Sequence, residues 1–319
     1  MGLTSLKDRL GAIPELISDK AIRMSAPAKC LLRYIRESPV INGVRSLYAA
    51  TVCSGEEEDR SSALPFAINF AAQAGAHLTA QWVAVRLVLP SAAGSSTISG
   101  LVASENHRIA AIADACASAS RADAEAAGVA CTAESTHEPH LEVMAGVSRR
   151  ARVHDLTILD QSQGALDPAR SLAEATLFEG GRAVLIVPAG LEKFRCQRAI
   201  IAWDGSAMAS RAVASALPLL RAAERVEILT ISGEKDLSHS VPGAQLAAHL
   251  AHHDIRVDVK ALPAGTRTAA DVLREQAGML DTDLIIMGAF KHSRWREWVL
   301  GGVTDSMLGE SSRPVLMSH

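Results

Sequence analysis

The chain has 319 residues, a length that favours about two domains of ordinary size. Its composition is globular, with 48% hydrophobic and 21% charged residues. The formal net charge of −3 provides no general attraction to nucleic acids or to anionic membranes, so we expect neither as a partner.

The cysteines and the apolar runs indicate where the protein works. No two cysteines form a CxxC pair, which favours reduced thiols over a disulfide framework or a metal site. No stretch reaches the roughly 18 to 20 apolar residues of a spanning helix, and charged residues interrupt the first 25 positions. We therefore expect a cytoplasmic protein without a bound metal. The cysteines are Cys30, Cys53, Cys116, Cys131 and Cys196.

Residues 1–43 differ from the rest of the chain. Their segment LKDRLGAIPELI can form a short amphipathic helix, whose length Gly11 and Pro14 limit. We interpret residues 1–43 as an N-terminal extension that packs on the body or is frayed.

From Val44 onward, short apolar runs alternate with helical stretches. The first half predicts strands at SLYAATV, HLTAQWVAV, VACTAEST, DLTILD and AVLIVP. Helices are predicted between them, around 61–74, 105–127, 141–152 and 172–178. Strands that alternate with helices of this length predict βαβ units and a parallel sheet.

The second half repeats this scheme. Strands are predicted at RAIIAW, RVEILTIS, IRVDVKAL, DLIIMG and RPVLMSH, with helices near 208–222, 242–252, 269–279 and 303–308. HDLTILDQ at 154–161 parallels TDLIIMGA at 282–289, and GGRAVLIVP at 180–188 parallels SSRPVLMSH at 311–319. We infer two copies of one five-stranded α/β unit, over residues 44–190 and 197–319.

The segment from Asp283 to His319 carries the most chemical information. It opens with a buried-type strand that ends at Gly288, followed by a basic, aromatic loop and then Gly301 and Gly302 at the start of a helix. Glycines let the backbone approach a phosphate closely, and free N–H groups at a helix N-terminus point at the anion. Open α/β sheets also bind ligands at the carboxyl ends of their strands.

This segment resembles the signature of the universal stress protein family. In that signature a glycine ends the fourth strand, two residues separate it from a second glycine, and nine residues separate the second glycine from a third, which is followed by Ser or Thr. Gly288 and Gly301 match the first and third positions. Lys291 replaces the second glycine and Gly302 the hydroxyl residue, and nearby Ser293 or Thr304 could supply the missing hydroxyl.

The segment IIAWDGS at 200–206 resembles the first strand and turn of the same family. The resemblance places Asp204 on the adenine-ribose side of the site, although Asp-Gly-Ser is also common turn chemistry. The predicted nucleotide-contacting set, which includes the start of the following helix, is Asp204, Gly288, Lys291, Ser293, Gly301, Gly302, Val303 and Thr304. No catalytic residue is predicted.

The first half shows no such signature. After DLTILD comes QSQGALDPAR, without a glycine directly after the strand, and its first strand ends in TVCSGEEEDR, without an acid equivalent to Asp204. Residues 44–190 are therefore predicted to be a copy that has kept the fold and lost the site.

The resemblance implies two tandem flavodoxin-like (Rossmann-like) α/β domains, each with a parallel sheet of order 3-2-1-4-5 covered by helices on both faces. They would pack about a pseudo-twofold axis, in a monomer or a homodimer. The implied function is a stress-response regulatory protein that binds ATP or AMP in its C-terminal half, with Mg²⁺ only alongside ATP. Two alternatives stay open: a stress protein that acts through protein contacts alone, and an ATP-hydrolysing enzyme.

Overall fold

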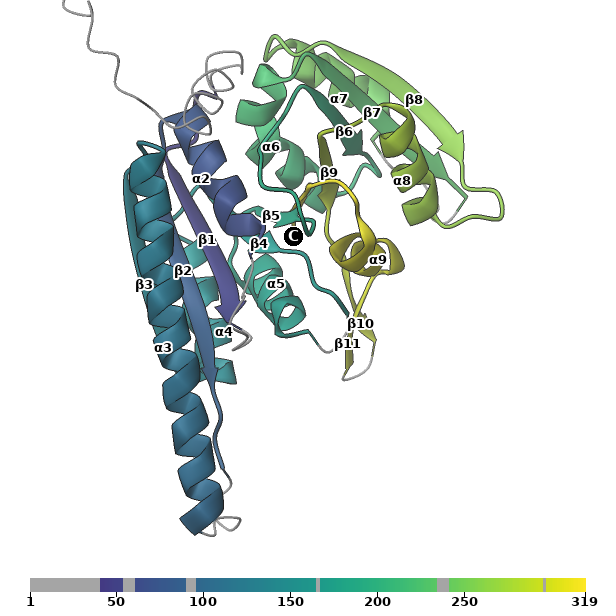
Figure 1. Ribbon diagram of the computed structural model, residues 1–319. Coiled ribbons are helices and arrows are strands. Elements are labelled where there is room, and N and C mark those ends of the chain that lie inside the picture. The colour runs from purple at the N-terminus through teal and green to yellow at the C-terminus, as the bar shows by residue number, and fades with distance from the viewer. Residues whose placement is uncertain (1–40, 54–60, 90–95, 165–166, 234–240, 295–296) are drawn as a thin grey trace, which may run out of the picture. The chain divides into compact units, whose positions relative to one another are not determined.

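The computed structural model describes residues 41–319 apart from 54–60, 90–95, 165–166, 234–240 and 295–296 (Figure 1). Most of the predicted N-terminal extension, residues 1–40, lies outside this described part. From Ile41 on, the described residues belong to one compact unit.

The first half alternates strands and helices in the predicted order. Its elements are β1 (Ser46–Cys53), α2 (Ala63–Ala74), β2 (His77–Arg86), α3 (Ser96–Ala126), β3 (Cys131–Pro139), α4 (His140–Ala151), β4 (Leu156–Asp160), α5 (Pro168–Glu179) and β5 (Val184–Val187). The longest helix, α3, begins nine residues earlier than the sequence predicted, and its buried side chains all lie between Ile109 and Ala124.

The second half has the same alternation with one addition. Its elements are β6 (Arg198–Ala202), α6 (Ala207–Ala222), β7 (Arg225–Ser232), α7 (Gly243–Ala251), β8 (Val257–Pro263), α8 (Ala269–Met279), β9 (Leu284–Gly288), β10 (Lys291–Arg294), β11 (Glu297–Leu300), α9 (Gly302–Glu310) and β12 (Val315–Ser318). The prediction of a loop between Ala289 and Leu300 is wrong for β10 and β11, which pair as an antiparallel hairpin.

Ten strands form one sheet in the order β3-β2-β1-β4-β5-β12-β9-β6-β7-β8. Each half therefore has the order 3-2-1-4-5, with parallel neighbours, which confirms the predicted fold. The two halves meet where β5 and β12 run antiparallel, with Leu185 opposite Leu316. The strand order is symmetric about this pair, as a pseudo-twofold arrangement requires.

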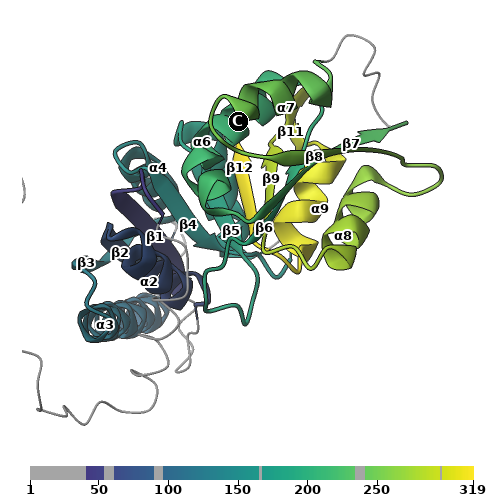
Figure 2. The same cartoon turned by 90° about the horizontal axis from the view of Figure 1, so that it is seen from above.

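Helices cover both faces of the sheet. Successive side chains of a strand point to opposite faces, so both faces carry apolar side chains. In β1, Leu47 and Ala49 enter the core beneath α2, α3, α6 and α7, whereas Tyr48 and Ala50 enter the core beneath α4, α5, α8 and α9. Figure 2 shows α2 and α3 on one side of the first half's strands and α4 on the other.

Several helices begin at side chains that satisfy the unpaired N–H groups of a first turn. The hydroxyl of Thr268 accepts from the N–H of Asp271 at 3.1 Å, and the Asp271 carboxylate accepts from the N–H of Thr268, which completes a capping box at α8. Ser206 caps α6 and Asp167 caps α5, where Pro168 takes the first helical position.

The connection between β5 and β6 packs against the first half. Phe194 is 1% exposed, and its ring stacks on Phe70 with centroids 4.1 Å apart and meets Phe66 edge-on. The backbone N–H of Phe194 donates to Asn69 at 2.9 Å. This aromatic contact anchors the connection on α2.

Candidate functional site

The carboxyl ends of β6, β7 and β9 surround a pocket of about 100 Å³ in the second half. Its walls are mainly apolar, and Asp204 and Thr304 are the polar side chains among them. Such a mixture of apolar walls with a few polar groups is typical of small-molecule sites in open α/β sheets. The apolar side chains include Leu229, Ile231, Leu273, Met287, Phe290 and Val303.

A second, polar groove of about 550 Å³ shares Phe290, Val303 and Thr304 with this pocket. Gly301 and Gly302 line it at the start of α9. Because three residues line both spaces, the apolar pocket and the polar groove adjoin. The other polar residues of the groove are Thr268, Asp271, Arg274, Ser306 and Glu310.

Asp204 lines the apolar pocket and also shapes the turn after β6. One of its carboxylate oxygens accepts from the N–H of Ser206 at 3.1 Å, and Gly205 between them has a φ of 73°. Ser206 in turn accepts from the N–H of Ala209 at 3.1 Å. The turn role that the sequence suggested is therefore present, on a carboxylate that faces the predicted site.

Gly288 has a structural reason to be glycine. A Cβ atom at this position would lie 2.5 Å from the backbone N of Ala209 and 2.9 Å from the carbonyl carbon of Met208. Both atoms belong to the first turn of α6, so the end of β9 and the start of α6 approach each other too closely for any side chain.

The start of α9 is bonded to the backbone of Phe290 and has no capping side chain. Gly301 donates its N–H to the carbonyl of Phe290 at 3.1 Å, and the hydroxyl of Thr304 accepts from the N–H of Phe290 at 3.0 Å. No side chain caps Gly301, and a Cβ added to Gly302 would meet nothing within 4 Å. The first N–H groups of α9 are therefore accessible to an anion in the groove.

Lys291 and Ser293 lie in β10, opposite Leu300 and Trp298 of β11. The structure describes the backbone of this hairpin and not the directions of its side chains. Asp204, Gly288, Val303 and Thr304 meet at the apolar pocket, and Gly301 and Gly302 join Val303 and Thr304 at the groove. Their assignment as nucleotide contacts stays a prediction.

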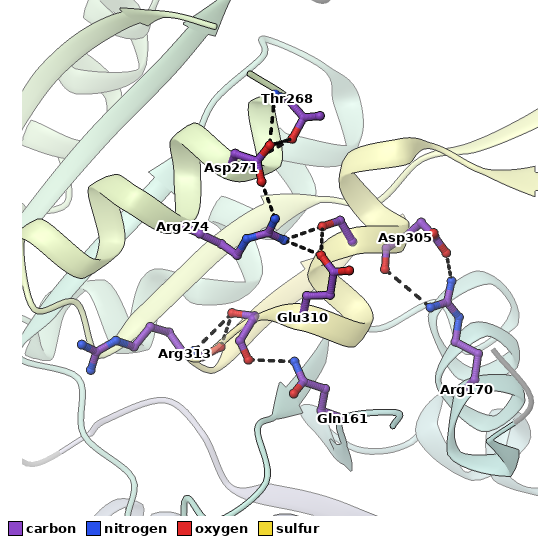
Figure 3. A network of polar contacts seen from close by, with 10 residues as sticks. Gln161, Arg170, Thr268, Asp271, Arg274, Asp305, Glu310 and Arg313 are labelled. Atoms are coloured by element: carbon purple, nitrogen blue, oxygen red, sulfur yellow. Dashed lines mark hydrogen bonds and ion pairs between the residues drawn. The ribbon is translucent and has the colours of Figure 1, made fainter. Parts of the chain in front are cut away.

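The sequence reasoning missed a charged cluster on one wall of the groove (Figure 3). Arg274 donates to Asp271 at 2.6 Å and to Glu310 at 2.9 Å, and it also bonds the hydroxyl of Ser306. The hydrogen bonds from the hydroxyl and the N–H of Thr268, with the bond from Arg274, hold the pKa of Asp271 below its usual range. Only the Asp271–Arg274 spacing of three, on one helix face, could have suggested this cluster.

In the first half, Asp160 occupies the end of β4, which corresponds to Gly288 at the end of β9. Its carboxylate accepts from the N–H groups of Ser62 and Ala63, both at 2.8 Å, and from the hydroxyls of Thr51 and Ser61. The Asp160 side chain thus caps α2. The corresponding residue of the second half, Gly288, has no side chain.

Comparison with known proteins finds a family match that covers the part of the chain that contains the pocket and the groove. A family model described as the universal stress protein family matches residues 196–319. The second half is a universal stress protein domain. The matched range contains both pockets and every predicted site residue. No curated protein sequence matches the chain.

Two solved structures resemble this chain over both of its halves. A universal stress protein from Archaeoglobus fulgidus DSM 4304 is 15% identical, with a TM-score of 0.62, over 84% of this chain and 97% of that one. A protein from Pseudomonas aeruginosa UCBPP-PA14, described as a universal stress protein, is 13% identical, with a TM-score of 0.50, over 86% of this chain and 93% of that one. These likenesses establish the fold of both halves.

Two further observations concern the described residues alone. Within them, no group of three or more His, Cys, Asp or Glu side chains gathers as a metal site would require. None of the helices in the described part of the chain combines the length and the apolar character of a membrane span.

Proposed function

We propose that this protein is a stress-response regulatory protein that binds an adenine nucleotide, AMP or ATP, in its second half. The observation that carries the proposal is the adjoining pair of spaces at the carboxyl edge of the sheet. An apolar pocket and a polar groove share Phe290, Val303 and Thr304, so one ligand can place an apolar and a charged end on either side of them.

Different residues of the site suit the base, the ribose and the phosphate of the nucleotide. Leu229, Ile231 and Met287 offer apolar surface to a planar base. The carboxylate of Asp204, which lines the same pocket, can accept hydrogen bonds from ribose hydroxyls. The N–H groups of Gly302 and Val303, at the positive end of the α9 dipole, suit the phosphate.

The function proposed is binding and release rather than turnover. Asp271 and Glu310 are both paired with Arg274, and Asp204 already accepts a backbone hydrogen bond. Among the described lining residues, these are the carboxylates that could serve as a base for water. With each of them engaged, the site supports holding a nucleotide better than hydrolysing it, and magnesium would enter only with ATP.

Titration calorimetry of the purified chain with AMP and with ATP tests the proposal. Gly302→Ser restores the hydroxyl of the family pattern, at a position where an added Cβ meets nothing within 4 Å. One more hydrogen bond to a charged phosphate should tighten binding by about threefold to thirtyfold. Gly278→Ser in α8 is the matched control, since its Cβ also meets nothing within 4 Å and it lines neither pocket. Absence of heat at millimolar nucleotide would reject the proposal.

One observation favours a second function, a stress protein that acts through protein contacts alone. The segment expected to be an open phosphate loop forms the β10–β11 hairpin, in which Lys291 pairs with Leu300. A strand at this position lacks the backbone freedom that the second glycine of the family pattern provides. If Lys291→Gly and Gly302→Ser together create nucleotide binding that the unchanged chain lacks, the protein-contact function is the correct one for this chain.

A further inference from the structure

The groove beside the start of α9 has an unusual charge for a phosphate site. Among the described residues that line it, the charged side chains are Asp271, Arg274 and Glu310. Two carboxylates therefore accompany one guanidinium, and this part of the groove carries an excess of one negative charge.

The guanidinium of Arg274 already donates hydrogen bonds to both acids. One terminal nitrogen of Arg274 donates to Asp271 at 2.6 Å, and the other donates to Glu310 at 2.9 Å and to Ser306 (Figure 3). Asp271 is itself fixed by the capping box with Thr268. A phosphate that approached Arg274 would have to displace a carboxylate, so the cation offers little net attraction.

The first phosphate of a nucleotide does not need Arg274. It finds the N–H groups of Gly302 and Val303 at the positive end of α9, next to the apolar pocket. Each further phosphate adds about one negative charge and would extend into the groove that the two carboxylates line. Repulsion from Asp271 and Glu310 therefore grows with the number of phosphates.

We infer that Asp271, Arg274 and Glu310 make the site selective for a nucleotide with a single phosphate, AMP in preference to ATP. This inference rests on the proposed nucleotide-binding function. It assigns to the cluster a role in specificity: the acids leave the first phosphate in place and oppose the second and third.

Glu310→Gln is the decisive variant. The Glu310 side chain is 65% exposed, and glutamine keeps its shape while removing its charge. We expect the unchanged protein to bind AMP more tightly than ATP, measured by calorimetry without a divalent cation. In Glu310→Gln the affinity for ATP should rise by about five- to tenfold, whereas the affinity for AMP should change by less than about twofold.

Asp258→Asn is the matched control. Asp258, on β8, forms an exposed ion pair with Arg225 on β7 and lines neither pocket, so its substitution removes the same charge at a remote place. It should leave the ratio of ATP to AMP affinity unchanged. In 1 M salt the Debye length is about 3 Å, and the preference of the unchanged protein for AMP should shrink.

The possible outcomes distinguish a failure of the proposed selectivity from a failure of the proposed nucleotide binding. If AMP binds and Glu310→Gln leaves the ratio of ATP to AMP affinity as it was, nucleotide binding stands and the charge-based selectivity is wrong. A preference for ATP in the unchanged protein would overturn the selectivity in the same way. If neither nucleotide binds, both are overturned.

Discussion

Gly288→Ala should destabilise the protein in the absence of any ligand. The added methyl carbon would lie 2.5 Å from the backbone N of Ala209, and Ala209 is 1% exposed within the core under α6. An ordinary contact would require the first turn of α6 to move by about 1 Å against packed neighbours. Overpacking of this kind costs about 1–3 kcal/mol of unfolding free energy.

Urea denaturation of the nucleotide-free protein measures this cost. Gly302→Ala is the control, because its Cβ meets nothing within 4 Å and alanine favours a helix over glycine by about 0.5–1 kcal/mol. The midpoint should therefore fall for Gly288→Ala and stay level or rise for Gly302→Ala. Equal midpoints for Gly288→Ala and the unchanged protein would refute the close approach of α6 to β9, and would leave ligand contact as the reason for this glycine.

Three further predictions concern single side chains. Asp160→Ala removes the acceptor of two N–H groups at the start of α2 and of the hydroxyls of Thr51 and Ser61, and should cost about 1–3 kcal/mol in urea denaturation. Asp160→Asn keeps one oxygen and should cost less. Burial, with a smaller effect of Asp283, raises the pKa of the Cys196 thiol to about 12, so iodoacetamide at pH 8 should modify Cys196 only when the protein unfolds. Rapid modification of Cys196 in the native protein, detected by mass spectrometry, would contradict this prediction. The lowered pKa of Asp271 stabilises the fold above its unfolded-state pKa of about 4 and is lost as the pH falls through the folded value, so Asp271→Asn should flatten the acid limb of the stability curve.

The fold followed from the sequence because its central strands are short apolar runs between helices. The segments 154–161 and 282–289 became β4 and β9, and the closing segments of the two halves became β5 and β12. Their repetition predicted two copies of one unit, and the family resemblance implied the pseudo-twofold arrangement. Edge-to-edge pairing of Leu185 with Leu316 was beyond the sequence, since an apolar strand indicates that it is buried and not which strand lies beside it.

The β10–β11 hairpin shows what a spacing motif leaves out. The signature fixes how many residues separate Gly288 from Gly301, and a loop and a hairpin satisfy the same count. The strands have four residues each, and the segment contains no Asn-Gly or Asp-Gly turn that would mark a hairpin. The sequence therefore gave no local signal against a loop.

The charged wall of the groove was missed for a different reason. Arg274 and Glu310 are 36 residues apart, and their contact depends on how α8 packs beside α9. Charged residues on helix surfaces are common, and sequence order does not reveal which of them face each other. The capping box of Thr268 and Asp271 is local and could have been read from its spacing.

The ends of β4 and β9 show a structural difference between the two halves. Asp160 and Gly288 correspond, since the matching segments 154–161 and 282–289 align them. In the first half a carboxylate supplies the anion that the N-terminus of α2 attracts, and Gly190 of the connecting segment bonds Ser62 beside it. In the second half glycine lets the first turn of α6 close directly on the strand. The first half thus satisfies the first N–H groups of α2 with its own carboxylate, whereas in the second half the Ser206 side chain caps α6.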